Sequence, residues 1–353
     1  MRCVWLVLGL LAASGCHDDA ASRNVDRGSP TKVSAPHDSR FDDITAWAEE
    51  AHSPSGAILV DGKTIFSWGD VTQKLEIHSC RKSFLSALIG IAVDKKQIDL
   101  ARTLDSLGID DEPPSLTPEE KQATILDLLE ARSGIYHEAA NETPSMKAGR
   151  PARGSHPHGS LWFYNNWDFN ALGGIYEQLT HTSIFDAFDA QIAKPIGMQD
   201  YAPADGFYSR MKTSRFPGYL FHMSTRDLAR FGQLYLQRGN WNGVQVVPEA
   251  WVAASVTSQS QTKPGAQSGY GYLWWTAGDG TGLFRDVDLG AGAFAAEGFG
   301  GHYVIVAPRF KLVVVTRADD AWYLADPETH NIGPNRTGKL LRLALAAAGV
   351  KPN

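Results

Sequence analysis

The pattern of hydrophobic and polar positions changes character twice along the chain. The first part predicts an amphipathic helix in "FDDITAWAEEAH", a β-hairpin in "SGAILVDGKTIFSWG" and a helix over residues 79–94. The hairpin is predicted because Asp61-Gly62, a pair typical of tight two-residue turns, separates two β-rich runs. The helix over 79–94 is apolar on nearly every side, which indicates that it lies buried in the protein.

Helical periodicity with long loops continues from about residue 99 to 244. Within it, "TPEEKQATILDLLEARSGI" predicts a helix that is capped at Thr117 and ends before Gly134, and "MSTRDLARFGQLYLQRGNW" predicts another. From about residue 268 the period shortens, and "GYGYLWWT", "GAFAAEG", "HYVIVAP" and "KLVVVTR" predict short strands. The segment "TGKLLRLALAAAG" predicts a final helix.

These elements predict a mixed α/β (α+β) fold, in which an antiparallel sheet is flanked by helices and formed by both ends of the chain. Residues 40–98 and 245–353 are expected to form this sheet subdomain. Residues 99–244 are expected to form an inserted, mostly helical subdomain.

The N-terminal residues are predicted to lie outside the fold. Arg2 precedes the apolar run "VWLVLGLLAA", which is too short to span a bilayer permanently and indicates a secretory signal. "AASGC" resembles a bacterial lipobox, so residues 1–16 are interpreted as a signal peptide and Cys16 as the acylated residue. Ordinary signal cleavage and an uncleaved tether are the alternatives. Residues 17–39 contain no aromatic side chain and predict a flexible linker.

We therefore expect an exported bacterial protein of the periplasm or cell envelope, held at the membrane only by a lipid anchor. The formal net charge of −6 and the lack of a basic patch argue against nucleic acid as a partner. Cys3 and Cys16 fall in the signal segment, which leaves Cys80 as the only thiol of the domain. The fold must then depend on its core rather than on an internal disulfide.

The spacing Ser-x-x-Lys is the first sign of chemistry. Residues three apart share one face of a helix, so a lysine can lie beside a serine. At a helix start, free N–H groups favour an alkoxide-like serine, and burial lowers the pKa of the lysine until it can act as a base. The spacing occurs four times, at Ser29/Lys32, Ser79/Lys82, Ser209/Lys212 and Ser260/Lys263.

Only Ser79 and Lys82 begin a predicted buried helix. The first pair lies in the linker, the third has no apolar periodicity behind it, and the fourth runs into Pro264, which disfavours a helical residue before it. A helix-start serine with an exposed lysine is the alternative reading of Ser79/Lys82.

Two further elements follow in order. "WFYNNWDFNALGGIYEQL" contains Tyr164-Asn165-Asn166, in which a phenol can carry a proton and an amide can orient a substrate. "AAEGFGGHYVIVAP" places glycines before a strand, where a substrate can approach the backbone and an N–H group can stabilise an oxyanion. A surface turn and a hairpin corner are the structural alternatives for these two elements.

In order and spacing, the three elements resemble the serine β-lactamase-like hydrolases, in the branch of class C β-lactamases, D,D-carboxypeptidases and family VIII esterases. "LLEARSGI", "MSTRDLARFG" and "GYGYLWW" resemble further segments of that family, so the resemblance covers about residues 40–348. It implies that Ser79 is the acylated nucleophile, Lys82 its base partner, Tyr164 the general base and acid, and Asn166 the orienting amide.

The third family motif is a lysine or histidine, then a threonine, serine or glycine, then a glycine. The resemblance aligns this motif with Phe299-Gly300-Gly301 and implies that the backbone N–H of His302 shares the oxyanion hole with that of Ser79. In the family, the motif's cation binds a substrate carboxylate and helps to keep the pKa of the tyrosine low. Phe299 can do neither, which leaves His302 and Arg317 as cations whose positions the sequence does not determine.

These residues predict acyl transfer from ester or amide bonds of small substrates without a metal or an organic cofactor, in preference to β-lactam or D-Ala-D-Ala hydrolysis. Two other classes of function are considered. His156 and His158 could contribute to a zinc site, but no further ligand motif accompanies them. A lipid-anchored sensor that is acylated once without turnover is the non-catalytic alternative.

Overall fold

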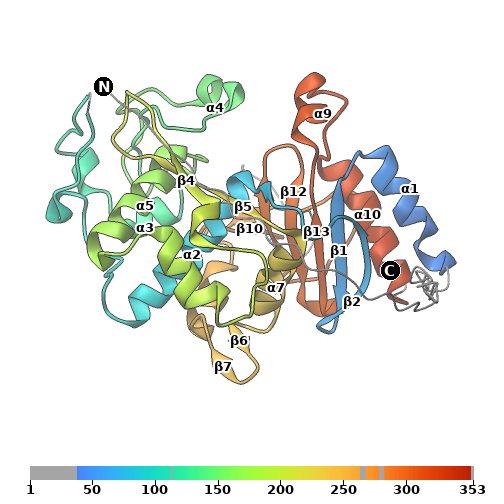
Figure 1. Cartoon of the computed structure of the whole chain (residues 1–353). Coiled ribbons are helices and arrows are strands. Elements are labelled where there is room, and N and C mark those ends of the chain that lie inside the picture. The colour runs from blue at the N-terminus through green and yellow to red at the C-terminus, as the bar shows by residue number, and fades with distance from the viewer. Residues whose placement is uncertain (1–37, 113, 263–267, 278–281, 351–353) are drawn as a thin grey trace, which may run out of the picture. The chain divides into compact units, whose positions relative to one another are not determined.

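The computed structural model describes residues 38–112, 114–262, 268–277 and 282–350 (Figure 1). The predicted signal peptide, Cys16 and nearly all of the predicted linker lie outside the described residues, as do Ser29, Lys32 and Lys263. In the part of the chain that is described, no helix has the length and apolarity needed to cross a membrane.

An eight-stranded sheet organises the fold, with the strand order β2-β1-β13-β12-β11-β10-β9-β8 and antiparallel pairing between neighbours. Its first two strands come from the start of the chain and the other six from the end, so the predicted fold class is confirmed. The strands are β1 (Ser55–Val60), β2 (Lys63–Gly69), β8 (Ser260–Gln261), β9 (Gly269–Tyr270), β10 (Trp275–Thr276), β11 (Phe294–Gly298), β12 (His302–Ala307) and β13 (Leu312–Thr316).

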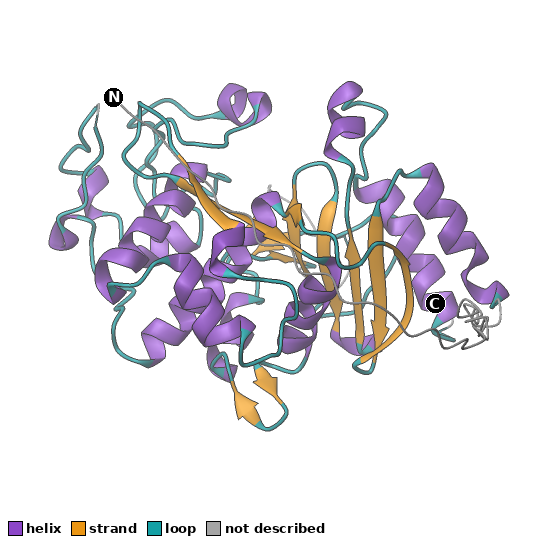
Figure 2. Ribbon diagram, in the orientation of Figure 1, coloured by secondary structure: helices purple, strands orange, loops and turns teal. Residues whose placement is uncertain are grey.

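Helices cover both faces of this sheet (Figure 2). Successive side chains of a strand point to opposite faces, so β13 contributes Val314 to one core and Val313 to the other. The Val314 face is covered by α1 (Asp42–Glu50) and α10 (Pro334–Ala347), which lie side by side in Figure 1.

The other face carries most of the helices and the small strands. The helices are α2 (Arg81–Asp94), α3 (Ile125–Leu129), α4 (Pro144–Gly149), α5 (Asn166–Thr180), α6 (Ile184–Phe188), α7 (Thr225–Leu236), α8 (Glu249–Ser255) and, beyond the sheet, α9 (Asp320–Ala325). The small strands are β3 (Leu75–Glu76), β4 (Gly206–Ser209), β5 (Gly218–Met223), β6 (Asn240–Trp241) and β7 (Val244–Gln245). Single 3-10 or π turns are η1 (Ser39–Phe41), η2 (His78–Cys80), η3 (Asp105–Leu107), η4 (Glu120–Gln122), η5 (Asp189–Ala193), η6 (Pro203–Asp205) and η7 (Pro308–Phe310).

Helix α7 belongs by sequence to the middle segment, yet it packs on the sheet. Gly232 permits this close approach, since a Cβ there would lie 2.7 Å from Val313 Cγ1 and 2.9 Å from Val304 Cγ1. The sheet side of the structure therefore includes a helix from within residues 99–244.

The single helix predicted from Thr117 is wrong. The structure has the turn η4, an extended residue at Ala123 with ψ of 138°, and then α3. The break follows from Thr124 and Asp127, whose side chains and backbone N–H groups cap each other and start a new helix.

Asp227, in the first turn of α7, fixes the loop between η5 and η6. It is fully buried, and its carboxylate accepts hydrogen bonds from the backbone N–H groups of Gln199, Asp200 and Tyr201 at 2.8–2.9 Å. The buried carboxylate thus supplies the acceptor for three successive backbone N–H groups, of which that of Tyr201 is itself buried.

Replacing Asp227 with Ala should lower the free energy of unfolding by about 3 kcal/mol, because three backbone N–H groups lose their shared buried acceptor. Urea denaturation followed by circular dichroism measures this loss. The matched control is Asp186→Ala, at the exposed third position of α6, which should cost about 0.5 kcal/mol. Equal losses in the two variants would contradict the anchoring role.

Candidate active site

Ser79 lies in the turn η2, which leads directly into α2. The residue before it, His78, has a left-handed φ of 47°, so the chain turns sharply at the serine. Lys82 lies one turn later and is 1% exposed. Its Nζ donates a hydrogen bond to Ser79 Oγ at 2.8 Å, and the structure thus brings together the two residues that the sequence paired.

The surroundings of Lys82 are apolar and aromatic. Its Nζ lies 4.9 Å from the ring centroid of Tyr164 and 5.1 Å from that of Phe169. Burial lowers the pKa of Lys82 well below its ordinary value, and the positive charge of Arg81 lowers it further. A neutral amine beside Ser79 Oγ can accept the hydroxyl proton, which an ammonium group cannot do.

Tyr164 lies just before α5, and its ring lies over the amine of Lys82. Burial raises the pKa of the Tyr164 phenol, whereas the nearby Ser79 side chain acts in the opposite direction. Its ring stacks on Trp275 with centroids 5.4 Å apart. Ser79, the amine of Lys82 and the phenol of Tyr164 therefore lie together.

Asn166 begins α5, close to these residues in sequence but with different partners. Its Nδ2 donates to the carbonyl of Asn141 at 2.7 Å and to that of Ala140 at 3.4 Å. Its Oδ1 is buried and has no hydrogen-bond partner among the described residues. Asn166 thus binds the loop before α4, and its predicted role as an orienting amide stays a prediction.

The third element is a hairpin between β11 and β12. Phe299, Gly300 and Gly301 form its loop, and His302 begins β12 opposite Gly298. Gly301 packs on Ile332, because a Cβ there would lie 2.3 Å from the Cβ of that residue. The loop that the sequence aligned with the family motif therefore packs toward the segment before α10.

Gly298, which sequence reasoning did not single out, lies against the turn that contains Ser79. A Cβ at Gly298 would lie 2.5 Å from the carbonyl oxygen of Ile77 and 3.3 Å from Sγ of Cys80. Only glycine allows β11 to come this close to η2. The signal in the sequence is ambiguous, because three glycines fall within residues 298–301.

Next to Ser79, His78 bridges two carboxylates. Its Nδ1 lies 3.2 Å from Glu76 Oε1 and its Nε2 lies 3.0 Å from Asp320 Oδ2, so both ring nitrogens carry protons when these bonds form. Burial alone would lower the pKa of His78. The hydrogen bonds to Asp320 and Glu76 outweigh burial and raise this pKa to about 9. The sequence did not predict this pair of contacts.

His302, unlike His78, carries a proton on only one ring nitrogen. Its Nδ1 accepts a hydrogen bond from Nε of Arg317 at 3.0 Å, so its proton is on Nε2, which faces Asp320 Oδ1 at 3.1 Å. Burial lowers the pKa of His302 to about 4. The ring is therefore neutral at neutral pH, and both of its nitrogens are used in hydrogen bonds.

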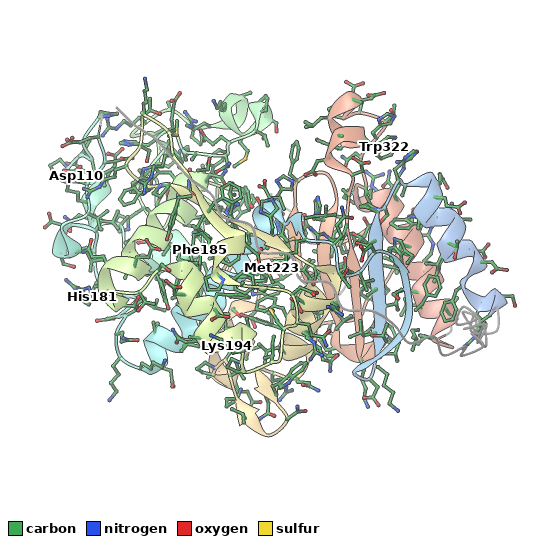
Figure 3. The ribbon with its side chains drawn as sticks, in the orientation of Figure 1. Asp110, His181, Phe185, Lys194, Met223 and Trp322 are labelled. Carbon is green, nitrogen blue, oxygen red and sulfur yellow. The ribbon has the colours of Figure 1, made fainter. Side chains whose placement is uncertain are left out.

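Arg317 is equally buried but has partners for its guanidinium. Besides His302, it donates to the carbonyls of Met223, Leu75 and Glu76 at 2.7–3.1 Å. Met223, labelled in Figure 3, ends β5, which is the middle strand of a separate sheet with the order β3-β5-β4. Arg317 directly follows β13 and therefore joins the eight-stranded sheet to this smaller sheet. Neither cation that the sequence left open is free to bind a substrate carboxylate.

His78, His302 and Asp320 are the one group of three potential metal ligands among the described residues, with ligand atoms within 4.8 Å of one another. The donor set does not fit a metal ion, because the Arg317 bond places the proton of His302 on Nε2, the nitrogen that would have to coordinate. The predicted zinc candidates His156 and His158 belong to no such group in the described part of the chain.

The remaining predicted residues are placed as follows. Cys80 is buried, its Sγ faces the carbonyl of His302 at 3.4 Å, and burial raises the pKa of its thiol to about 12, so it packs rather than reacts. Ser209 ends strand β4 and does not start a helix.

Comparison with known proteins gives one matching family model, Beta-lactamase, over residues 44–318. A solved structure from Bacillus anthracis, assigned as a 6-aminohexanoate-dimer hydrolase, is 20% identical, with a TM-score of 0.65 over 87% of this chain and 82% of that one. A class C β-lactamase is 15% identical, with a TM-score of 0.60 over 89% and 96%. A penicillin-binding protein homologue from Pyrococcus abyssi is 20% identical, with a TM-score of 0.56 over 78% and 72%. No curated protein matches the chain.

Proposed function

The chain belongs to the beta-lactamase family, and from this premise we propose that it is a serine hydrolase acting on ester or amide bonds of small substrates. The observation that carries the proposal is the 2.8 Å hydrogen bond between Lys82 Nζ and Ser79 Oγ at a buried, aromatic-lined position. A surface lysine would be protonated at neutral pH, whereas burial lowers the pKa of Lys82 well below its ordinary value and so favours the basic form.

The proposed reaction has two steps. Ser79 Oγ attacks the substrate carbonyl while its proton passes to Lys82, and the tetrahedral intermediate collapses as Tyr164 donates a proton to the departing alcohol or amine. Water then attacks the acyl-enzyme, and the same groups move its proton in the reverse direction. The protonated phenol of Tyr164 suits the donor role, because its pKa lies above the ordinary value.

The oxyanion hole is assigned to the backbone N–H groups of Ser79 and Phe299. In the family pattern, the second donor follows the glycine of the third motif. Gly298 is the glycine that touches the nucleophile's turn, so the donor moves from His302 to Phe299. One donor of this kind contributes about 3–4 kcal/mol to stabilising the transition state.

This register also changes the reading of the third motif, which becomes Ala296-Glu297-Gly298. No cation stands where the family has a lysine or histidine, and Glu297 introduces an acid. Burial raises the pKa of Glu297 to about 8. Within the described residues, the carboxyl group of Glu297 forms no hydrogen bond or ion pair. These features favour neutral esters or amides over substrates with a carboxylate, such as β-lactams or D-Ala-D-Ala peptides.

Two alternatives make different predictions for the same assay. A β-lactamase or D,D-carboxypeptidase would prefer a chromogenic cephalosporin or a D-Ala-D-Ala peptide to a short-chain p-nitrophenyl ester. A sensor would release one equivalent of product per protein and then stop. Ser79, Lys82 and Tyr164 are all present and in contact, which favours turnover.

Replacing Ser79 with Ala should reduce turnover of p-nitrophenyl esters by at least about a thousandfold, because the attacking oxygen is lost. Thermal unfolding should stay close to that of the parent protein. Ser209→Ala is the matched control, since it removes a serine with the same spacing to a lysine, and it should keep full activity. Undiminished activity in Ser79→Ala would show that another residue is the nucleophile.

Glu297 gives a prediction about pH. The carboxyl is neutral below its pKa of about 8 and negative above it, so discrimination against a carboxylate-bearing ester should grow as the pH rises through that value. The ratio of kcat/KM for the neutral ester to that for the charged ester should increase about fivefold to tenfold. In Glu297→Gln the ratio should not change with pH. A parent protein whose ratio is independent of pH would contradict the position given to Glu297.

A further inference from the structure

Arg81 is a buried cation without a counter-ion. It begins α2, between Cys80 and Lys82, and is 1% exposed. Nη1 donates to the carbonyl of His78 at 3.3 Å, and the guanidinium lies 5.1 Å from the ring centroid of Tyr219. Nε and Nη2 are buried and have no hydrogen-bond partner among the described residues.

Such a residue is costly to the fold. A buried charge without a partner strongly destabilises a protein, and arginine does not shed its charge by losing a proton. Arg317 shows the ordinary solution in the same protein, since its guanidinium donates to a histidine and three carbonyls. Arg81 has no comparable set of acceptors, so its charge acts on its neighbours unneutralised.

The neighbours that experience this charge are the groups of the proposed reaction. A like charge in a weakly polar environment disfavours the ammonium form of Lys82, and it favours the anionic form of Tyr164. Among the other titratable groups nearby, Cys80 opposes the effect on Lys82, and Glu297 opposes the effect on Tyr164. Glu76 and Tyr219 also experience the charge of Arg81, but neither contacts Lys82 in the described structure.

We propose that Arg81 is a positioning residue that keeps Lys82 in its neutral, basic form. It would thereby provide, from inside the Ser-x-x-Lys segment, a positive charge that the third motif of this chain lacks. This inference rests on the proposed function, because it assigns Lys82 the role of base. Direct contact with substrate is the competing role, and it is disfavoured because the unpartnered nitrogens are closed to solvent.

The test is the pH profile of acylation at Ser79, measured as the rate of labelling by a fluorophosphonate probe and, in parallel, as kcat/KM for a neutral p-nitrophenyl ester. The reaction needs unprotonated Lys82, so its rate falls as the pH drops through the pKa of that residue. Removing the neighbouring charge in Arg81→Met should move the midpoint of this acid limb upward by about one pH unit or more. The rate at high pH should recover to within about threefold of the parent value.

Arg81→Gln is the second neutral variant if the Met variant does not fold. Arg210→Met removes an exposed arginine and is the matched control, with an unchanged profile expected. An unchanged midpoint in both neutral variants, with a uniform loss of rate at every pH, would overturn the inference and leave Arg81 a structural role. A raised KM with an unchanged midpoint would indicate substrate contact and would equally overturn it. Failure of the parent protein to label at any pH would overturn the proposed function itself, and the inference with it.

Discussion

The hydrogen bond between Lys82 and Ser79 is the interaction around which the structure is arranged. It requires a lysine to be held in the interior, where the charged form is unfavourable, at the start of a helix that is buried along nearly its whole length. The rings of Tyr164 and Phe169 close over the amine, and both come from the start of α5 or the residues just before it. The packing of α2 against α5 therefore forms part of the core and also creates the apolar surroundings that lower the pKa of Lys82.

A second set of contacts keeps the serine turn next to the sheet. Gly298 lets β11 touch the turn, and Asp320, at the start of α9, bridges His78 and His302. Arg317 extends this network to β5 and β3 through their backbone carbonyls. Ser79 thus lies where the helical part of the chain and the sheet are joined by buried polar groups. Such groups are costly unless each has a partner, so the geometry of the turn is strongly specified.

Much of this arrangement was predictable from the sequence. The fold class follows from local periodicity, and the pairing of Ser79 with Lys82 follows from helical spacing, both of which are short-range properties. Tyr164 required the resemblance to a family, because nothing local links it to a serine 85 positions earlier. The contact between His78 and Asp320 could not be predicted from the sequence, because it joins residues 242 positions apart and depends on the tertiary fold.

What the sequence left undecided or predicted wrongly has equally physical causes. The proposed shift of the motif glycine from Gly301 to Gly298 could not come from the sequence, because the sequence does not show where the β11–β12 hairpin turns, and pairing of Gly298 with His302 sets that register. The helix from Thr117 was overextended because the Thr124–Asp127 capping box competes with continuous helical periodicity.

The most direct test of the account is mass spectrometry of the protein quenched in acid during turnover of a slowly hydrolysed ester. The account predicts that the protein gains the mass of one acyl group, that peptide mapping places this group on Ser79, and that Lys82→Met forms the adduct far more slowly. An acyl group on any other residue, or turnover with no covalent intermediate under conditions where acylation outpaces deacylation, would contradict it.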